Sequence, residues 1–239
     1  MRCLIADLIT DLPAADGLDL RCRDYLYCGD QPADITIRKQ LYRRDKYAPT
    51  LSDSTVAYME AAYQFCLELV NFGGFYLHAS AVVVDGKAYL FSGHSHAGKS
   101  THSRQWQALF GDKAVIINDD KPALRRIDGV WYAYGTPWCG KDGINTNAKA
   151  PVAGVCFLKK AAENKIRRMN TFEAMQNILS QTIYKFQNAE NLDKMLAHLN
   201  LFLSEIPVYE LENLPQLAAA RLSYETMSGK TLEDNYETE

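Results

Sequence analysis

The chain has 239 residues and a formal net charge of -3, with 47% hydrophobic and 23% charged residues. These values are ordinary for a globular protein, and the mild negative charge gives no indication of a nucleic-acid or anionic-membrane partner. No apolar run is long enough to cross a bilayer. The six cysteines lack CxxC spacing and no signal peptide is visible, so we expect reduced thiols in a cytoplasmic protein.

The first 50 residues are β-prone and irregular, and the partly alternating segment 35–41 predicts a half-buried strand. A helix is then expected to begin after a capping residue at 52–54 and to end near Asn71, before two glycines. We expect its apolar stripe to pack in the core rather than to bind a partner. The stripe consists of Val56, Met59, Tyr63, Cys66, Leu67 and Val70.

Two β-prone runs, 74–84 and 87–92, are separated by an Asp-Gly dipeptide, which is a strong signal for a two-residue hairpin. The register of that hairpin places His78 opposite Gly93. Because the second strand runs antiparallel to the first, we predict a mixed sheet rather than one built only from parallel βαβ units.

Residues 93–101 read Gly-His-Ser-His-Ala-Gly-Lys-Ser-Thr and match the phosphate-loop pattern GxxxxGK[ST] between a strand and a helix. Backbone N–H groups of such a loop converge on phosphate oxygens, and the helix that follows turns its positive end toward the anion. We expect Lys99 to reach the β- and γ-phosphates of ATP and Ser100 to offer its hydroxyl to Mg²⁺. The residues predicted to bind the nucleotide are Gly93, His94, Ser95, His96, Ala97, Gly98, Lys99, Ser100 and Thr101.

Two adjacent acids, Asp119 and Asp120, follow a short apolar run at 114–117 that predicts a buried strand. A strand that ends in an acid supplies the metal ligand of many phosphate-loop sites. Since two adjacent side chains point in different directions, one acid can hold Mg²⁺ and the other can face the acceptor. We assign Mg²⁺ to Asp120, together with Ser100, and the acceptor proton to Asp119; the sequence leaves the reverse assignment open.

A second Asp-Gly hairpin is predicted at 123–134, and its register places the glycine-flanked loop 135–143 beside the two acids. From this loop Lys141 is expected to stabilise the transferring phosphoryl group. Trp138 either walls the pocket or packs in the core, and Cys139 has no identifiable partner that would make it a nucleophile. Three other histidines lack the spacing of a zinc site, and we expect them to face solvent or the acceptor: His94, His96 and His102.

The remainder of the chain is expected to be scaffold. A buried strand is predicted at 153–158, and Asn170 with Glu173 forms a capping-box pattern at the start of a helix. The expected helices at 172–187, 190–205 and 217–227 and the last strand at 207–211 would cover the sheet. We expect one domain at 1–228, made of an N-terminal part (1–50), a nucleotide-binding core (51–160) and a helical cover (161–228), and then a polar tail (229–239).

A histidine on the strand before the loop, the GxxxxGKS loop and a strand that ends in Asp-Asp together resemble the catalytic domain of HPr serine kinase/phosphorylase. More closely, the chain looks like the small HPr-kinase-related proteins of the phosphoenolpyruvate-carboxykinase-like fold, with motif resemblance over about residues 75–160. The resemblance implies an α/β fold with a mixed, largely antiparallel sheet and a P-loop, and it implies ATP and Mg²⁺. It also implies catalytic roles for Asp119, Asp120 and His78, and a metal-binding role for Ser100.

The chain departs from true HPr kinases, which have a glutamate where Thr101 stands and a Glu-Arg-Gly signature where 136–141 stands. We therefore expect a Mg²⁺/ATP-dependent kinase acting on another hydroxyl, in a serine of a peptide or small carrier protein or in a small alcohol. The alternative is a nucleotide-binding regulatory or assembly module without phosphoryl transfer, and phosphorolysis or decarboxylation is a third candidate. The sequence does not determine the oligomeric state, and a homo-oligomer is one possibility.

Overall fold

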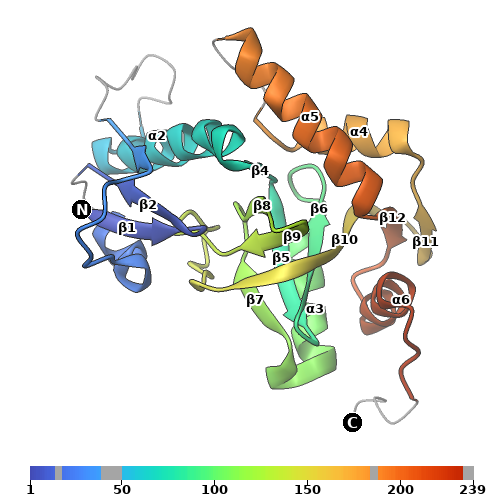
Figure 1. The fold of residues 1–239 in the computed structure, drawn as a ribbon. Coiled ribbons are helices and arrows are strands. Elements are labelled where there is room, and N and C mark those ends of the chain that lie inside the picture. The colour runs from blue at the N-terminus through green and yellow to red at the C-terminus, as the bar shows by residue number, and fades with distance from the viewer. Residues whose placement is uncertain (14–17, 39–49, 184–187, 234–239) are drawn as a thin grey trace.

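The computed structural model describes residues 1–13, 18–38, 50–183 and 188–233, which form a three-stranded sheet and a nine-stranded sheet with helices around them (Figure 1). The strands are β1 (Arg2–Ile5), β2 (Leu8–Asp11), β3 (Ile35–Thr36), β4 (Gly74–Tyr76), β5 (Ala79–Val84), β6 (Lys87–Ser92), β7 (Val115–Asn118), β8 (Ala123–Ile127), β9 (Val130–Tyr134), β10 (Lys149–Lys160), β11 (Lys165–Arg168) and β12 (Val208–Asn213). The α-helices are α1 (Leu18–Arg21), α2 (Asp53–Glu68), α3 (Lys99–Phe110), α4 (Thr171–Ser180), α5 (Ala189–Glu205) and α6 (Leu217–Ser228).

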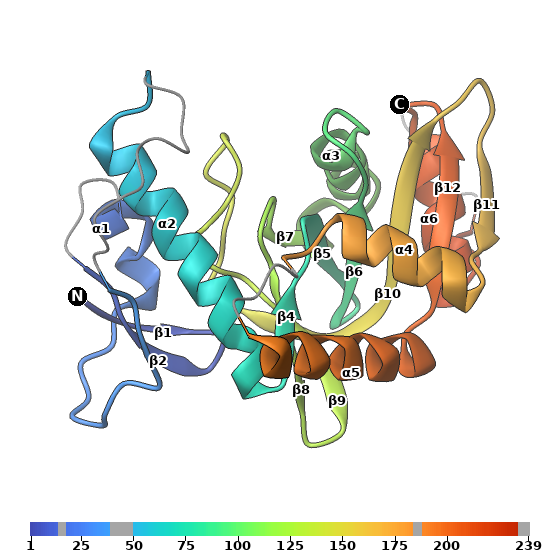
Figure 2. The ribbon, with the colours of Figure 1, turned by 90° about the horizontal axis from the view of Figure 1, so that it is seen from above.

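Helix α2 packs against the small N-terminal sheet, and Figure 2 shows it running along that sheet, away from α3 and α6. As predicted, Ser52 caps the helix, since its Oγ accepts a hydrogen bond from the N–H of Thr55 at 3.2 Å. A turn of 3-10 helix continues it to Phe72, and Gly73 ends it with a φ of 72°.

The buried face of α2 differs from the predicted stripe. Met59 and Tyr63 are 41% and 39% exposed, so the prediction that they pack in the core is wrong. Alanines occupy much of the inner face that packs against the N-terminal sheet, and the larger Met59 and Tyr63 lie outside this face. The buried residues are Val56, Ala57, Ala61, Ala62, Phe65 and Cys66.

Several predicted elements are shorter in the structure. The strand expected at 35–41 is reduced to β3, and its last three residues lie outside the described part of the chain. The helix expected at 172–187 ends at Ser180, and residues 184–187 also lie outside the description. The predicted capping box is confirmed, because Asn170 and Glu173 exchange side-chain and backbone hydrogen bonds of 2.9 and 3.1 Å.

The β5–β6 hairpin follows the predicted register. Its turn at 85–86 has φ angles of 52° and 70°, both in the left-handed region. The last pair of the ladder is Ala79 with Ser92, so His78 and Gly93 are the next positions on the two chains. Strand β6 also pairs in parallel with β10, which confirms that the sheet is mixed.

The β8–β9 hairpin brings a loop to the acid-bearing turn that follows β7. Its last ladder pair is Ala123 with Tyr134. Beyond the ladder the Oγ1 of Thr136 donates to the carbonyl oxygen of Lys121 at 2.7 Å, which continues the predicted register. The loop 135–143 therefore lies beside the two adjacent acids.

Strand β10 changes partners along its length. It pairs antiparallel with β9 at its start, parallel with β6 in its middle and parallel with β12 toward its end. The ladder with β12 ends at Lys160 and Asn213, so these two residues lie side by side. Strand β11 has no counterpart among the predicted strands and pairs antiparallel with β12.

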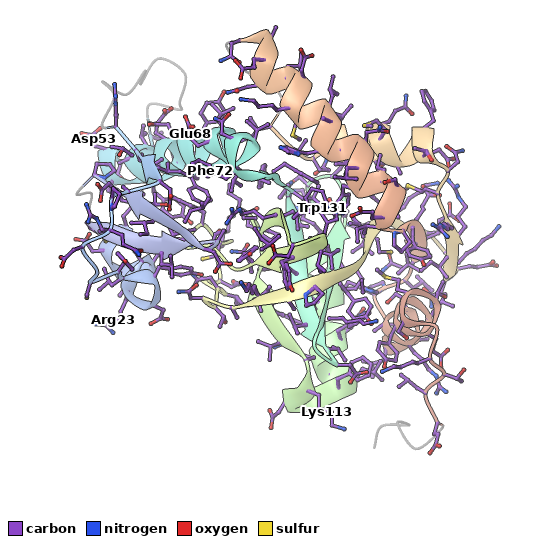
Figure 3. The ribbon with its side chains drawn as sticks, in the orientation of Figure 1. Arg23, Asp53, Glu68, Phe72, Lys113 and Trp131 are labelled. Atoms are coloured by element: carbon purple, nitrogen blue, oxygen red, sulfur yellow. The ribbon has the colours of Figure 1, made fainter. Side chains whose placement is uncertain are left out.

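Helices cover both faces of the large sheet, with α4 and α5 above it and α3 and α6 below it in Figure 1. On the first face Phe75, Trp131 and Phe202 pack edge to face, and Figure 3 shows Trp131 in the interior near α5. On the second face the ring centres of Trp106 and of Tyr224 in α6 lie 5.6 Å apart. No helix in the described residues is long and apolar enough to cross a membrane.

Candidate functional site

The glycine-rich segment between β6 and α3 forms a tight loop. Gly93 and Gly98 have φ angles of 143° and 100°, which favour glycine. A Cβ on Gly93 would lie 3.0 Å from the carbonyl oxygen of Leu158, so glycine lets β10 pass close to the loop. Helix α3 begins at Lys99, and the N–H groups of its first turn have no partner within the helix. Such a helix start suits an anion.

Lys99 connects the loop with the two adjacent acids. Its Nζ donates to the carbonyl oxygen of Gly93 at 3.1 Å. Burial lowers the pKa of Lys99, and the carboxylates of Asp120 and Asp119 partly offset this effect. The ammonium therefore lies in the electrostatic field of both acids, at the mouth of the glycine loop.

Asp120 pairs with a histidine and a lysine. Its Oδ1 lies 3.2 Å from Nε2 of His78, and its Oδ2 forms an ion pair with Nζ of Lys121. Burial by itself would raise the pKa of Asp120, but the hydrogen bond to His78 and the charge of Lys121 outweigh burial and lower this pKa to about 2. Asp120 is thus a fixed anion at any pH near neutral.

Gln181 holds His78 in place from the other side of the imidazole ring. The ring Nδ1 of His78 lies 3.1 Å from the side-chain Oε1 of Gln181. The backbone N–H of His78 also donates to the backbone carbonyl of Gln181 at 2.8 Å. The side-chain Nε2 of Gln181 donates to the backbone carbonyl of Ser180, so the side-chain Oε1 of Gln181 is the atom that faces the imidazole ring. With acceptor oxygens at both ring nitrogens, His78 is clamped between Gln181 and Asp120.

Asp119 is the less exposed of the two acids, at 8%, and its Oδ1 has no hydrogen-bond partner among the described residues. Its N–H donates to the carbonyl of Ile144 at 3.3 Å. Gly140 lies against it, because a Cβ there would be 3.1 Å from the Asp119 carbonyl oxygen. A buried carboxylate oxygen without a partner is costly, and it is suited to a group that arrives from outside.

Asn118 fixes the turn that carries the acids. Its Oδ1 accepts hydrogen bonds from the N–H groups of Asp120 at 2.9 Å and of Lys121 at 2.6 Å. Its Nδ2 donates to the carbonyl oxygens of Thr136 and Trp138 at 3.0 and 3.3 Å. One buried side chain thus joins the acid turn to the loop 135–143, which is why the loop lies where its register predicts.

The loop reaches the acids, but its lysine does not. Lys141 is exposed and forms no hydrogen bond or ion pair within the described part of the chain. The neighbouring Asp142 forms an ion pair with Arg104 of α3 instead. Trp138 is fully buried, and its ring centre lies 4.9 Å from that of Phe65. Of the two roles expected for Trp138, the structure therefore shows core packing.

Tyr58 and Arg21 hold the same loop from the N-terminal side. The Tyr58 hydroxyl accepts hydrogen bonds from the Cys139 N–H at 2.9 Å and from the Arg21 guanidinium at 3.0 Å. Arg21 also contacts the Cys139 sulfur at 3.2 Å. Burial raises the pKa of the Cys139 thiol and outweighs the opposing effect of Arg21, so this cysteine is not activated as a nucleophile.

Removing the Tyr58 hydroxyl should destabilise the fold. In Tyr58→Phe the Cys139 N–H loses its acceptor, and an unsatisfied buried donor costs about 1–3 kcal/mol. Urea denaturation measures the free energy of unfolding. Tyr63→Phe on the exposed side of the same helix is the matched control and should change it by less than about 0.5 kcal/mol. Equal effects in the two variants would contradict a structural role for the Tyr58 hydroxyl.

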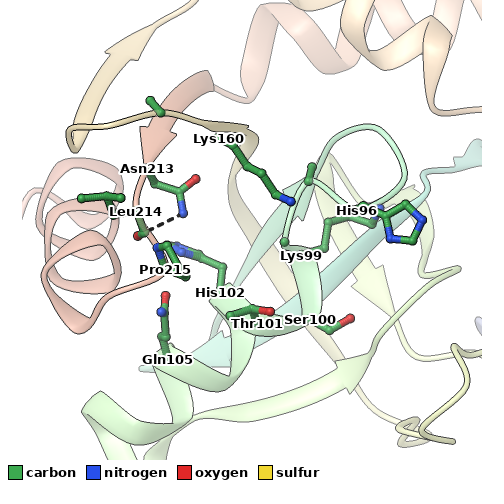
Figure 4. A pocket seen from close by; sticks show the side chains of 13 residues that line it. His96, Lys99, Ser100, Thr101, His102, Gln105, Lys160, Asn213, Leu214 and Pro215 are labelled. Carbon is green, nitrogen blue, oxygen red and sulfur yellow. Dashed lines mark hydrogen bonds between the residues drawn. The ribbon is translucent and has the colours of Figure 1, made fainter.

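A pocket of about 820 Å³ opens beside the loop (Figure 4). It extends from the loop along α3 to the ends of β10 and β12, and Lys99 and Ser100 line one end of it. His78, Asp119 and Asp120 are not among its lining residues.

The prediction made for His102 is wrong. It was expected to face solvent or an acceptor with His94 and His96, and those two are exposed, but His102 is only 1% exposed. Position 102 lies on the inner side of α3, where the His102 Nε2 contacts the Ser223 hydroxyl of α6 at 3.0 Å and the ring packs on Phe91. Helical periodicity from Lys99 could have indicated this burial, because Trp106 lies one turn further on.

Buried His102 should make the fold sensitive to acid. Burial lowers its pKa from 6.5 to about 4, and the nearby Gln105 only partly opposes the shift. Between these pH values the unfolded state binds a proton that the folded state does not, so stability falls on acidification by up to about 3 kcal/mol. His102→Gln should flatten the loss between pH 6.5 and 4 in urea denaturation, whereas exposed His94→Gln should not. An unchanged slope in His102→Gln would contradict this account.

Together the fold and the site define a mixed α/β protein with a glycine-rich loop between strand and helix and a His-Asp pair beside it. A family model described as "SynChlorMet cassette protein ScmC" matches residues 50–214, and the chain belongs to this family. Among solved structures, the Hpr(Ser) kinase/phosphatase from Coxiella burnetii is 14% identical with a TM-score of 0.35, and the match covers 64% of this chain and 93% of that chain. This is a weak relation in fold. No curated protein matches the chain.

Proposed function

We propose that the protein is a Mg²⁺/ATP-dependent kinase that phosphorylates a hydroxyl acceptor. One observation carries the proposal: the acids lie one strand away from the start of a loop with the phosphate-loop pattern, since Ala79 pairs with Ser92 just before the loop and donates its backbone N–H to the Asp120 backbone carbonyl at 3.2 Å. A loop suited to phosphate oxygens thus lies next to two acids that can serve a metal and a proton. Phosphoryl transfer depends mainly on such positioning and charge.

The donor set suits Mg²⁺, which prefers hard oxygen ligands. Ser100 and Asp120 would hold the ion. Asp120 is ionised near neutral pH, His78 orients its Oδ1 from 3.2 Å, and the ion would displace the Lys121 ammonium from its Oδ2. When bound, Mg²⁺ would neutralise charge on the phosphate oxygens. His78 contacts Asp120 rather than Asp119, so we assign it a positioning role through that carboxylate.

In the proposed reaction the acceptor oxygen forms a bond to the γ-phosphorus while the bond from that phosphorus to the β–γ bridging oxygen breaks. ADP leaves with the bond's electron pair, and the acceptor proton passes to the carboxylate of Asp119, whose buried Oδ1 has no partner among the described residues. Lys99 offsets the charge on the β- and γ-phosphates. Lys141 would assist only if its exposed loop closed over the acceptor.

The family description speaks of a cassette protein, so we look for the acceptor among the products encoded beside this chain. The test incubates the protein with γ-³²P-labelled ATP, Mg²⁺ and each neighbouring peptide or carrier protein. The proposal predicts an acid-stable phosphoester on a serine or another hydroxyl of one of them. ATP binding without label transfer to any neighbour would contradict it.

One observation favours the alternative of a nucleotide-binding module without transfer. The described residues contain no group of three or more His, Cys, Asp and Glu side chains that could hold a metal ion. Thr101 also stands where HPr kinases have a glutamate. For such a module we expect ATP binding or slow hydrolysis that no acceptor stimulates.

A further inference from the structure

Lys121, directly after the two acids, carries a movable charge on a fixed backbone. Its backbone N–H donates to the Asn118 Oδ1 at 2.6 Å, and its carbonyl oxygen accepts from the Thr136 Oγ1 at 2.7 Å. The side chain is 31% exposed, and its only hydrogen-bond or ion-pair partner among the described residues is the Asp120 carboxylate. The flexible four-carbon stem lets the ammonium leave that carboxylate without any change in the backbone.

Both carboxylate oxygens of Asp120 have a partner. The His78 Nε2 lies 3.2 Å from Oδ1, and the Lys121 Nζ pairs with Oδ2. His78 is fixed, because Gln181 holds both its ring and its backbone. Lys121 is held at its ammonium by a single ion pair. An ion that binds Asp120 therefore takes Oδ2 and displaces the lysine rather than the histidine.

The charge balance beside the glycine loop gives this lysine a role. The Ala79 N–H donates to the Asp120 backbone carbonyl, and Ala79 pairs with Ser92 just before the loop, so the acid lies one strand away from the loop start. A polyphosphate on the loop and an unpaired carboxylate at Asp120 would repel each other. The Lys121 ammonium neutralises this carboxylate. Mg²⁺ would neutralise it too, and it would also bind the phosphate oxygens, which a displaced lysine leaves to the ion.

We infer that Lys121 is a built-in competitor of Mg²⁺ for the Oδ2 of Asp120: it neutralises the carboxylate when ATP binds without the metal, and it gives way when Mg²⁺ binds with ATP. Lys121 thereby sets how strongly ATP binding depends on Mg²⁺. It is a positioning residue that acts through Asp120. The inference rests on the proposed function, because it takes the glycine loop as the phosphate site and Asp120 as a ligand of Mg²⁺.

Calorimetric titration of the full chain with ATP, in Mg²⁺ and in EDTA, tests this role without any acceptor or turnover. The ratio of the two affinities is the gain from Mg²⁺. In Lys121→Met, metal-free ATP should bind about 10-fold more weakly than to the wild type, because the Asp120 carboxylate loses its counter-cation. Affinity in Mg²⁺ should stay within about threefold, so the gain should rise by about 10-fold over the wild-type gain. Lys121→Gln, with a polar uncharged side chain, should show the same rise.

Three further variants separate this competition from a general loss of charge. Lys121→Arg keeps a cation beside Asp120 and should keep the wild-type gain. Lys230→Met removes a lysine that is also paired with an aspartate, Asp85, at the turn of the β5–β6 hairpin and so at the end opposite to the glycine loop. It should change the gain by less than about twofold. In the double variant Asp120→Asn/Lys121→Met the gain should be absent, as in Asp120→Asn alone, because the carboxylate for which the two cations compete is gone.

A wild-type gain in both Lys121→Met and Lys121→Gln would overturn the inference, and so would a rise of the same size in Lys230→Met. The phosphate and metal sites would then still stand, because the wild type would bind ATP and respond to Mg²⁺. If the wild type bound no ATP, or bound it equally well in Mg²⁺ and in EDTA, the proposed sites themselves would be overturned, and the inference with them.

Discussion

Replacing Lys99 by alanine is expected to weaken ATP binding by about 100-fold. The Lys99 ammonium lies at the mouth of the glycine loop, 3.1 Å from the Gly93 carbonyl, within the field of two carboxylates. Triphosphate oxygens would replace the weak neutral acceptor at Gly93 by charged ones, and charge-assisted hydrogen bonds are about twice as strong. Calorimetric titration with ATP and Mg²⁺ measures the loss directly.

Lys113→Ala is the matched control, because this exposed lysine lies just beyond the far end of α3 (Figure 3). Its removal changes net charge by the same amount and should leave ATP affinity within about twofold. A similar loss in both variants would mean that ATP responds to the overall charge of the protein. In that case the loop would not be a specific phosphate site.

Asp119→Asn should abolish most phosphoryl transfer while leaving ATP binding nearly intact. The amide keeps the shape of the carboxylate but cannot take the acceptor proton, and loss of a general base lowers rates by about 10²–10⁴-fold. The effect on ATP affinity should be only a few-fold, because Asp119 influences Lys99 through space rather than through a hydrogen bond. Label transfer and calorimetry, measured on the same preparation, separate the two quantities.

Asp128→Asn serves as the control, since Asp128 is an exposed turn residue with a φ of 49° that asparagine tolerates. It should transfer phosphate as fast as the wild type. Unchanged turnover in Asp119→Asn would remove the proton-acceptor assignment. If Asp120→Asn then stopped transfer without affecting Mg²⁺ dependence, the roles of the two aspartates would have to be exchanged.

Turn chemistry made the arrangement around the glycine loop predictable. Asp-Gly dipeptides favour two-residue hairpins, and a hairpin of known turn has a single register over its whole ladder. Counting along the ladders placed His78 next to Gly93 and placed the loop 135–143 next to the acids, and the structure has both. Helix caps such as Ser52 were equally local signals.

The partners that complete the site were not predictable, because they come from elements far apart in the chain. Gln181 reaches His78 across 103 positions, and His102 contacts Ser223 across 121. No motif or period links such residues; packing of α4 and α6 onto the sheet brings them together. The position of the Lys141 side chain was also not predictable. The hairpin register determines where the loop runs, but it does not determine where an exposed side chain on the loop points.

The dependence of ATP affinity on Mg²⁺ in wild type and in Asp120→Asn tests the central claim most directly, namely that the glycine loop and the acids form one site. Calorimetric titration with and without Mg²⁺ should show that the ion tightens ATP binding to the wild type about 10-fold or more. In Asp120→Asn this gain should disappear while Mg²⁺-free binding persists. A gain of the same size in both proteins, or no ATP binding by the wild type, would contradict the account.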